Sequence, residues 1–346
     1  MKLTTVALAA AAAGAIGLGA LAIPAGADSQ PSLPPVSPED LVASVLTARA
    51  PALGGTVVVH NALGLPPLPD VAGPLAQPLL TQPESSFRIW ADGQDHGRLA
   101  LPSRNGEQDF IEDGTTLWHY DSASRTATAL KHGTRPAHRH EPVADPAQAA
   151  REMIDAVRKT STVSVDGTGT VAGRPVYQLV LTPAPAERTL LREVRVAVDS
   201  AQRIPLQLTV LANGSPDPAL RIGFSDLTVG PQDPALFHFT PPAGVTVTRP
   251  EHQPEAGPRP GDHGEPAIRT QGEGWDTVVL GQLPPAQPGK RADPLAVFQR
   301  VAQPLSGPWG QGWVVRTAVV TVLVTADRRV AVGAVPQQVL EEALTR

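Results

Sequence analysis

Side chains that could take part in chemistry are spread thinly along this 346-residue chain. The densest group is acidic, with Glu107, Asp109, Glu112 and Asp113 falling within seven residues. Carboxylates can act as general acids or bases, and they can bind metal ions. On alternating positions of a strand, however, such a group usually forms a solvated face. We therefore interpret this run as surface charge rather than as an active site.

Histidines offer two further candidates. His138-x-His140-Glu141 could in principle ligate a metal, but no partner set at a defined spacing accompanies it. A solvated loop is therefore the favoured interpretation. Asp95-His96 lies in a turn context, and no serine motif occurs for it to activate. Neither group predicts catalysis.

Nucleotide and thiol chemistry are also disfavoured. Gly289-Lys290-Arg291 lacks the Ser or Thr that a phosphate-binding loop needs after its Lys, and the chain has no HExxH motif and no nucleophile elbow. There is no cysteine, which excludes disulfides, a lipidated N-terminal Cys and thiol catalysis. Net charge is −5 with no basic block, so we predict no nucleic-acid partner. We predict a protein that is not an enzyme and needs no cofactor or metal.

An apolar ligand is the remaining possibility, and the segment from Ala62 to Pro83 suggests it. The segment is rich in proline and leucine, whereas a solvated loop of this length should be polar. It could pack over the open edge of a sheet, or it could form a mobile apolar lid over a hydrophobic cavity. The ligand-binding candidates in it are Leu63, Leu65, Leu68, Leu75, Leu79 and Leu80.

Large aromatic side chains follow in the next strands and complete the candidate set. They are Phe87, Trp90, Trp118 and Tyr120. Because strand side chains alternate, Trp118 and Tyr120 should share one face, with Leu117 and His119 on the other. These aromatics could pack in the core or line a cavity. The two roles are compatible, since a lipid-binding cavity is lined by the same apolar side chains that form a core.

The elements that position these residues read as antiparallel strands from Phe87 to Leu130. Asp113-Gly114 is a strong hairpin signal of the type I′ kind, in which both central residues need a positive φ. Such a meander cannot bury both faces alone. Five further strand-like runs follow, at 162–170, 174–182, 190–199, 204–211 and 220–229. Together they predict one large, curved antiparallel sheet.

Two helices are predicted beside this sheet. Ser37-Pro38 begins the first, with Ser as the N-cap and Pro at the first helical position. Asp145-Pro146 begins the second, which runs to about Lys159 with apolar residues at helical spacing. The second helix is a candidate cover for one face of the sheet.

Two motifs resemble the LolA family of periplasmic lipoprotein carriers. Asp113-Gly114-Thr115-Thr116-Leu117-Trp118-His119-Tyr120-Asp121, followed by Thr126-Ala127-Thr128, is similar to the central hairpin of that family. The stretch from Leu236 to Val247 resembles its closing strands. The resemblance covers residues 38–247 and implies a half-barrel whose helices plug an apolar cavity for acyl chains of lipids or lipoproteins.

A second resemblance concerns the layout of the whole chain. RseB-like regulators join a LolA-like domain to a smaller C-terminal domain and bind a membrane-embedded anti-sigma factor. The order of segments here is similar, which makes an envelope sensor with a membrane-protein partner the alternative to a carrier. The residues themselves match LolA more closely.

The chain is divided by composition into five segments. Residues 1–27 read as a secretory signal ending in Ala25-Gly26-Ala27, or alternatively as a retained N-terminal anchor. Residues 28–37 read as a disordered tether, 38–249 as the LolA-like domain, and 250–266 as a Pro- and Gly-rich linker. Residues 267–346 read as a small α+β module: a strand at 275–280, a helix after Asp293-Pro294, a hairpin of 312–325 with 329–335, and a terminal helix. The predicted product is exported, to the cell envelope or beyond.

Overall fold

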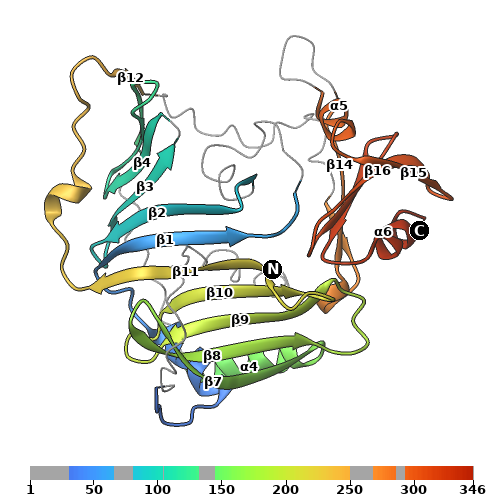
Figure 1. Ribbon diagram of the computed structural model, residues 1–346, viewed down its shortest axis with the longest axis horizontal. Coiled ribbons are helices and arrows are strands. Elements are labelled where there is room, and N and C mark those ends of the chain that lie inside the picture. The colour runs from blue at the N-terminus through green and yellow to red at the C-terminus, as the bar shows by residue number, and fades with distance from the viewer. Residues whose placement is uncertain are drawn as a thin grey trace.

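The computed structural model describes residues 31–65, 81–103, 105–131, 145–249, 268–285 and 293–345. In these residues twelve strands form one large curved sheet and six form a smaller one. Figure 1 shows the small sheet beside one end of the large one. The α+β class and the large unclosed sheet predicted from the sequence are confirmed.

The first half of the large sheet is an antiparallel series, in which each strand pairs with the next along the chain. Its members are β1 (Leu53–Asn61), β2 (Glu84–Ala91), β3 (His96–Ser103), β4 (Gly106–Asp113), β5 (Thr116–Asp121) and β6 (Thr126–Lys131). The predicted strands from Phe87 to Leu130 are therefore present.

The turn between β4 and β5 differs from the prediction. The last paired residues are Glu112 and Leu117, so four residues separate them, and of the predicted pair Gly114 alone has a positive φ (86°). Asp113 instead closes the turn with its carboxylate, which accepts hydrogen bonds from the backbone N–H of Thr115 and Thr116 at 3.0 and 2.7 Å. The hairpin prediction is right and the type I′ turn is wrong, because a side-chain acceptor replaces the second left-handed residue.

The second half of the large sheet continues from β1 in the order β11, β10, β9, β8 and β7. These strands are β7 (Ser161–Val171), β8 (Arg174–Pro183), β9 (Leu191–Asp199), β10 (Pro205–Ala212) and β11 (Pro218–Val229). They coincide with the five predicted runs. At the other edge, β12 (Thr246–Thr248) adds in parallel to β6.

The predicted closing strands from Leu236 to Val247 are mostly not strands. The chain first forms a short 3-10 helix, η1 (Pro234–Phe237), whose N-cap Asp233 accepts a hydrogen bond from the Ala235 N–H. Strand structure begins only at Thr246. Pro234 explains the difference, because a fixed φ near −65° and a missing N–H suit the first turn of a helix better than a strand.

Helices α2 (Pro38–Thr47) and α4 (Pro146–Arg158) begin at the predicted capping residues, Ser37 and Asp145. They pack on each other and against β7. Leu41 of α2 is fully buried in a cluster with Tyr177 and Val198 of β8 and β9. One end of the large sheet is thus covered by a helical pair.

The predicted tether is packed where the structure describes it, over residues 31–37. Leu33 and Val36 join the cluster around Leu41. The hydroxyl of Tyr177 donates to the carbonyl of Pro34 at 3.0 Å. The prediction of disorder is wrong for this part, because two apolar residues among the prolines pack against the cluster around Leu41.

The small sheet has the order β13 (Arg269–Gln271), β14 (Val278–Gln282), β18 (Arg329–Gly333), β17 (Thr321–Thr325), β16 (Gly310–Arg316) and β15 (Gln303–Gly307). Its helices are η2 (Gly274–Asp276), α5 (Pro294–Gln299) and α6 (Gln337–Thr345). Two predictions fail in detail. The strand expected over 275–280 starts at Val278, and the run 312–325 is two strands separated by a turn at 317–320.

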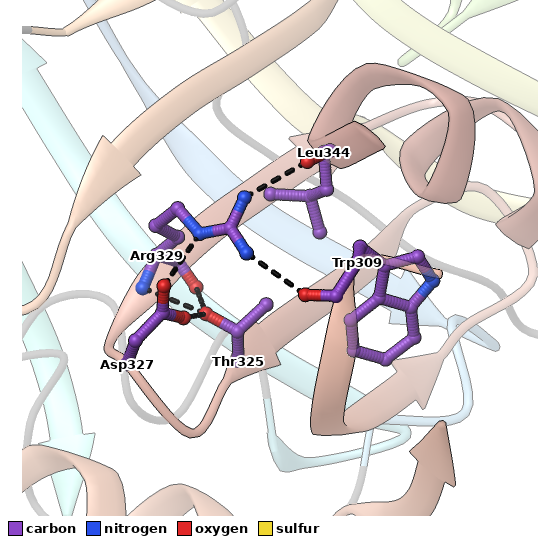
Figure 2. A network of polar contacts seen from close by, with 5 residues as sticks. All are labelled: Trp309, Thr325, Asp327, Arg329 and Leu344. Carbon is purple, nitrogen blue, oxygen red and sulfur yellow. Dashed lines mark hydrogen bonds and ion pairs between the residues drawn. The ribbon is translucent and has the colours of Figure 1, made fainter. Parts of the chain in front are cut away.

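Helix α6 packs on the small sheet through Val339, Leu340, Ala343 and Leu344. Figure 2 shows how its end is held: Arg329 donates to the carbonyl of Leu344 at 2.8 Å and to that of Trp309 at 2.9 Å. The Arg329 Nε also donates to Asp327 at 2.8 Å. One guanidinium therefore ties the last turn of α6 to the β15–β16 turn and to the β17–β18 hairpin.

Candidate binding face on the large sheet

Cross-strand register assigns the side chains of the first half of the large sheet to two faces. Directly opposite residues in an antiparallel pair project to the same side. Val57 lies opposite Phe87 and Phe224, and Leu99 lies opposite Ile89 and Phe110. We call the side that carries them the apolar face. Its apolar members are Val57, Val59, Phe87, Ile89, Leu99, Leu101, Phe110, Leu117, Leu130, Ile222 and Phe224.

Burial on the apolar face decreases from the middle of the sheet toward β6. Val57 and Phe87 are buried, and Leu99 and Phe110 are half-buried members of the same cluster. Leu130 on β6 is 43% exposed. A strip of apolar side chains therefore continues from the core to an accessible edge.

A hollow of about 320 Å³ lies beyond Arg88 and Ala100, the last paired residues at this end of β2 and β3. Its wall combines residues of the apolar face with residues that the register places on the opposite face; the first are Ser85, Phe87 and Leu101, the second are Val58, Glu84, Ser86 and Pro102, and Gln82 completes it. The Ser85 hydroxyl is buried and has no hydrogen-bond partner in the described part of the chain. The volume is at the lower end of the range of known small-molecule pockets, roughly 300–1,000 Å³.

His119 is the titratable side chain that interrupts the apolar face on β5. Its ring stacks on Phe110 with centroids 4.4 Å apart and an interplanar angle of 9°. The nearest polar partner is the Gln108 side-chain oxygen at 3.4 Å. Burial lowers the pKa of His119, and the charge of Asp121 acts weakly in the opposite direction. Burial therefore favours the neutral form of the imidazole where it stacks on Phe110.

The predicted aromatic residues do not lie together. Phe87 is on the apolar face, whereas Trp90, Trp118 and Tyr120 project from the opposite side of the sheet. Trp118 and Tyr120 each contact Phe239, with ring centroids 5.2 Å apart. The predicted sharing of a face by Trp118 and Tyr120 is confirmed, but these residues pack beneath the chain that follows η1 and not beside Phe87.

The predicted leucines of the Ala62–Pro83 segment are divided as well. Leu63 packs between the two sheets, with Ala219 and Val319, and Leu65 is half-buried. Leu68, Leu75, Leu79 and Leu80 lie outside the described residues, as do the predicted signal, the His138–Glu141 group and the 250–266 linker. Their ligand-binding role stays a prediction.

Of the apolar face, Phe87 alone was a predicted binding residue; Ile89, Leu99, Phe110 and Leu130 are among the members that were not predicted from the sequence. The sequence feature that could have identified them is the alternation of apolar and polar residues along each strand, which assigns apolar residues to one face of the sheet. That alternation does not say which face stays open, because the covering residues come from distant parts of the chain.

The acidic run has structural partners. Asp109 is buried and accepts hydrogen bonds from Arg98, at 2.9 Å to Nε and 2.8 Å to Nη2. Asp113 closes the β4–β5 turn, as described above. Among the described residues, no group of three or more His, Asp or Glu could hold a metal ion, and no helix is long and apolar enough to span a membrane.

These features define a two-sheet α+β protein whose larger sheet carries an apolar, partly accessible face. No family model matches the chain, and no curated protein matches it. Among solved structures, the complex of MucA and MucB from Pseudomonas aeruginosa matches with 18% identity over 88% of this chain and 94% of that chain, at a TM-score of 0.44.

A LolA superfamily protein from Nitrosomonas europaea matches with 11% identity over 59% of this chain and 99% of its own, at a TM-score of 0.24. A putative outer membrane lipoprotein-sorting protein domain from Vibrio parahaemolyticus has 11% identity over 52% and 83% of the two chains, at a TM-score of 0.18. Both kinds of protein expected from the sequence, RseB-like and LolA-like, are thus found among the matches. The TM-scores are low, and no conclusion about ligand or partner rests on them.

Proposed function

We propose that this chain is an exported, non-enzymatic protein that binds an acyl chain of a lipid or lipoprotein on the apolar face of its large sheet. The observation that carries the proposal is the strip of apolar side chains from Phe87 to the accessible Leu130, interrupted on β5 by His119, with a hollow beside Phe87 where β2 and β3 separate. In the described residues, the helical pair α2 and α4 packs at the other end of the sheet, against β7.

The strip is large enough to matter energetically. Each methylene removed from water contributes about 0.8 kcal/mol, so half of a sixteen-carbon chain could contribute roughly 6 kcal/mol before ordering costs. Taken alone, roughly 6 kcal/mol corresponds to a dissociation constant of about 40 μM before those costs are subtracted, and burial of more of the chain would be needed for micromolar binding. The resemblance to lipoprotein carriers noted in the sequence points to the same class of ligand.

The experiment is the uptake of a fluorescent fatty acid by the purified protein, combined with native mass spectrometry for a co-purifying lipid. Leu99→Ser and Leu130→Ser should weaken uptake, because each introduces a hydroxyl into the strip. Leu46→Ser is the matched control, since Leu46 is also a partly exposed leucine but lies on α2. A wild-type protein that neither takes up the probe nor carries lipid would refute the proposal.

A second candidate function is regulation through a membrane-protein partner. The observation that favours it is an exposed apolar patch on the small sheet: Ile268 is 72% exposed and Val279 is 40% exposed. The register Thr270–Val279 places both on the same side of β13 and β14. Exposed apolar residues that cluster often mark interaction sites. A partner captured from native membranes by wild-type protein and lost with Val279→Asp would support this role.

A further inference from the structure

The small sheet contacts the large sheet at the end of its central strand, β1. The N–H of Ala318, in the β16–β17 turn, donates to the carbonyl of Leu63 at 2.8 Å. The Leu63 side chain packs in a cluster with Ala219 from the large sheet and Val319 from the small one. Leu63 is therefore held from both sides.

The turn that holds Leu63 is itself rigid. The Thr317 N–H donates to the Val320 carbonyl at 2.9 Å, and the Thr317 hydroxyl accepts from the Val320 N–H at 2.9 Å. Val319, at the tip, is only 8% exposed. The turn thus presents a fixed donor and a fixed apolar side chain to the end of β1.

The end of β1 is directly connected to the hollow where β2 and β3 separate. The Asn61 N–H donates to the Pro83 carbonyl at 2.7 Å, one residue before β2. Gln82, Glu84 and Ser85, which flank Pro83, contribute to the wall of the hollow. Leu63 is therefore linked to this wall through Asn61 and Pro83.

A second set of contacts fixes the orientation of the small sheet. The Thr189 hydroxyl and the Leu190 N–H both donate to the Ala334 carbonyl, at 2.7 and 2.8 Å. Arg188 forms a two-pronged ion pair with Glu342 of α6 at 2.7 and 2.8 Å. The guanidinium network of Figure 2 holds the same helix on its sheet.

η2 adds a third point of attachment. The indole N–H of Trp275 donates to the Ser161 hydroxyl at 2.6 Å, and its backbone N–H donates to Glu187 at 2.8 Å. The small sheet is therefore attached at the end of β1, at the β8–β9 loop and at the start of β7.

We infer that the small sheet is a positioning element for the apolar face: when docked, it holds the ends of β1 and β2 in the arrangement that binds an acyl chain. This inference rests on the proposed function. Its physical basis is preorganisation, since a wall that is already ordered loses less entropy when a ligand binds. Because such coupling is reciprocal, a bound chain must also strengthen docking of the small sheet.

The test uses the full-length protein and two variants that each introduce an aspartate. Val319→Asp places a carboxylate in the inter-sheet cluster, whereas Ser306→Asp places one at an exposed position of β15 in the small sheet. Amide hydrogen exchange of Leu190, whose N–H bonds across the interface, measures docking in each sample. We expect Val319→Asp to weaken fatty-acid binding about fivefold or more and Ser306→Asp to leave it within about twofold.

Graded variants make the result decisive. Arg188→Gln removes the ion pair with Glu342, and Thr189→Val removes the hydroxyl bond to Ala334. Probe affinity should fall in step with the protection of the Leu190 amide across the series. If wild type binds the probe and the variants bind it equally well although their Leu190 amide has lost its protection, the inference is overturned and the proposed function stands. Absence of binding by wild type would instead refute the proposed function itself.

Discussion

His119 makes the stability of the protein depend on pH in a defined direction. Burial lowers its folded-state pKa below the ordinary value of about 6.5. The unfolded chain therefore binds more protons than the folded one once the pH falls below that value. By linkage, the free energy of unfolding is highest above about pH 6.5 and falls as the pH drops from there toward the folded-state pKa.

The prediction is that His119→Phe reduces this loss, because a phenyl ring keeps the stacking on Phe110 and has no proton to gain. Melting temperatures measured at pH 7.5 and pH 5.0 should differ less for the variant than for wild type. His238→Phe, at an exposed position, serves as the control. Equal differences in all three proteins would show that His119 does not titrate in the folded state as described.

At the residue scale, the sequence was informative about alternation and uninformative about partners. The opposite orientation of Trp118 and His119 follows from their adjacency in one strand and is confirmed. What covers each side chain did not follow. Phe239, which packs on Trp118 and Tyr120, lies more than a hundred residues further along the chain, and nothing local in sequence links it to them.

At the element scale, the β4–β5 hairpin rests on a single left-handed residue. Gly114 has a φ of 86°, which is sterically unfavourable for any residue with a Cβ and most unfavourable for a β-branched one. A Cβ at this position would also lie 3.2 Å from the His96 ring nitrogen. We expect Gly114→Val to destabilise the protein by about 1–3 kcal/mol.

Chemical denaturation measures this effect, with Gly281→Val as the matched control. Gly281 is in β14, its φ is not positive, and no atom lies within 4 Å of the position that a Cβ would occupy there, so valine should be tolerated. Unchanged stability of Gly114→Val would mean that the turn adopts another conformation.

Strands were predicted well where alternation was regular and poorly where a side chain closed a turn. The apolar run from Gly312 to Thr325 has strong β propensity, yet it is broken at Thr317 because that hydroxyl accepts from the N–H groups of Val319 and Val320. Asp113 acts similarly in the β4–β5 turn. Side-chain acceptors of this kind compete with strand pairing and are easily missed from periodicity alone.

At the scale of the whole molecule, the two sheets could be anticipated and their docking could not. Proline and glycine between residues 250 and 266 indicate a boundary from composition alone. The contacts that join the sheets, such as Leu63 with Ala318 and Ser161 with Trp275, pair residues more than a hundred positions apart. A linker between units predicts mobility, whereas the interface predicts that the units stay together.

Proteolytic cleavage between the two sheets distinguishes mobility of the linker from stable association of the sheets. The composition of residues 250–266 makes this stretch the expected first site of limited proteolysis. Because Leu63, Thr189, Leu190 and Trp275 all bond across the interface, the two fragments should co-elute on size exclusion at micromolar concentration after the cut. Val319→Asp should release them as separate peaks, since it places a charge in the apolar part of the interface. Wild-type fragments that separate at once would show that the linker alone joins the sheets, and initial cuts within residues 62–83 would place the domain boundary elsewhere.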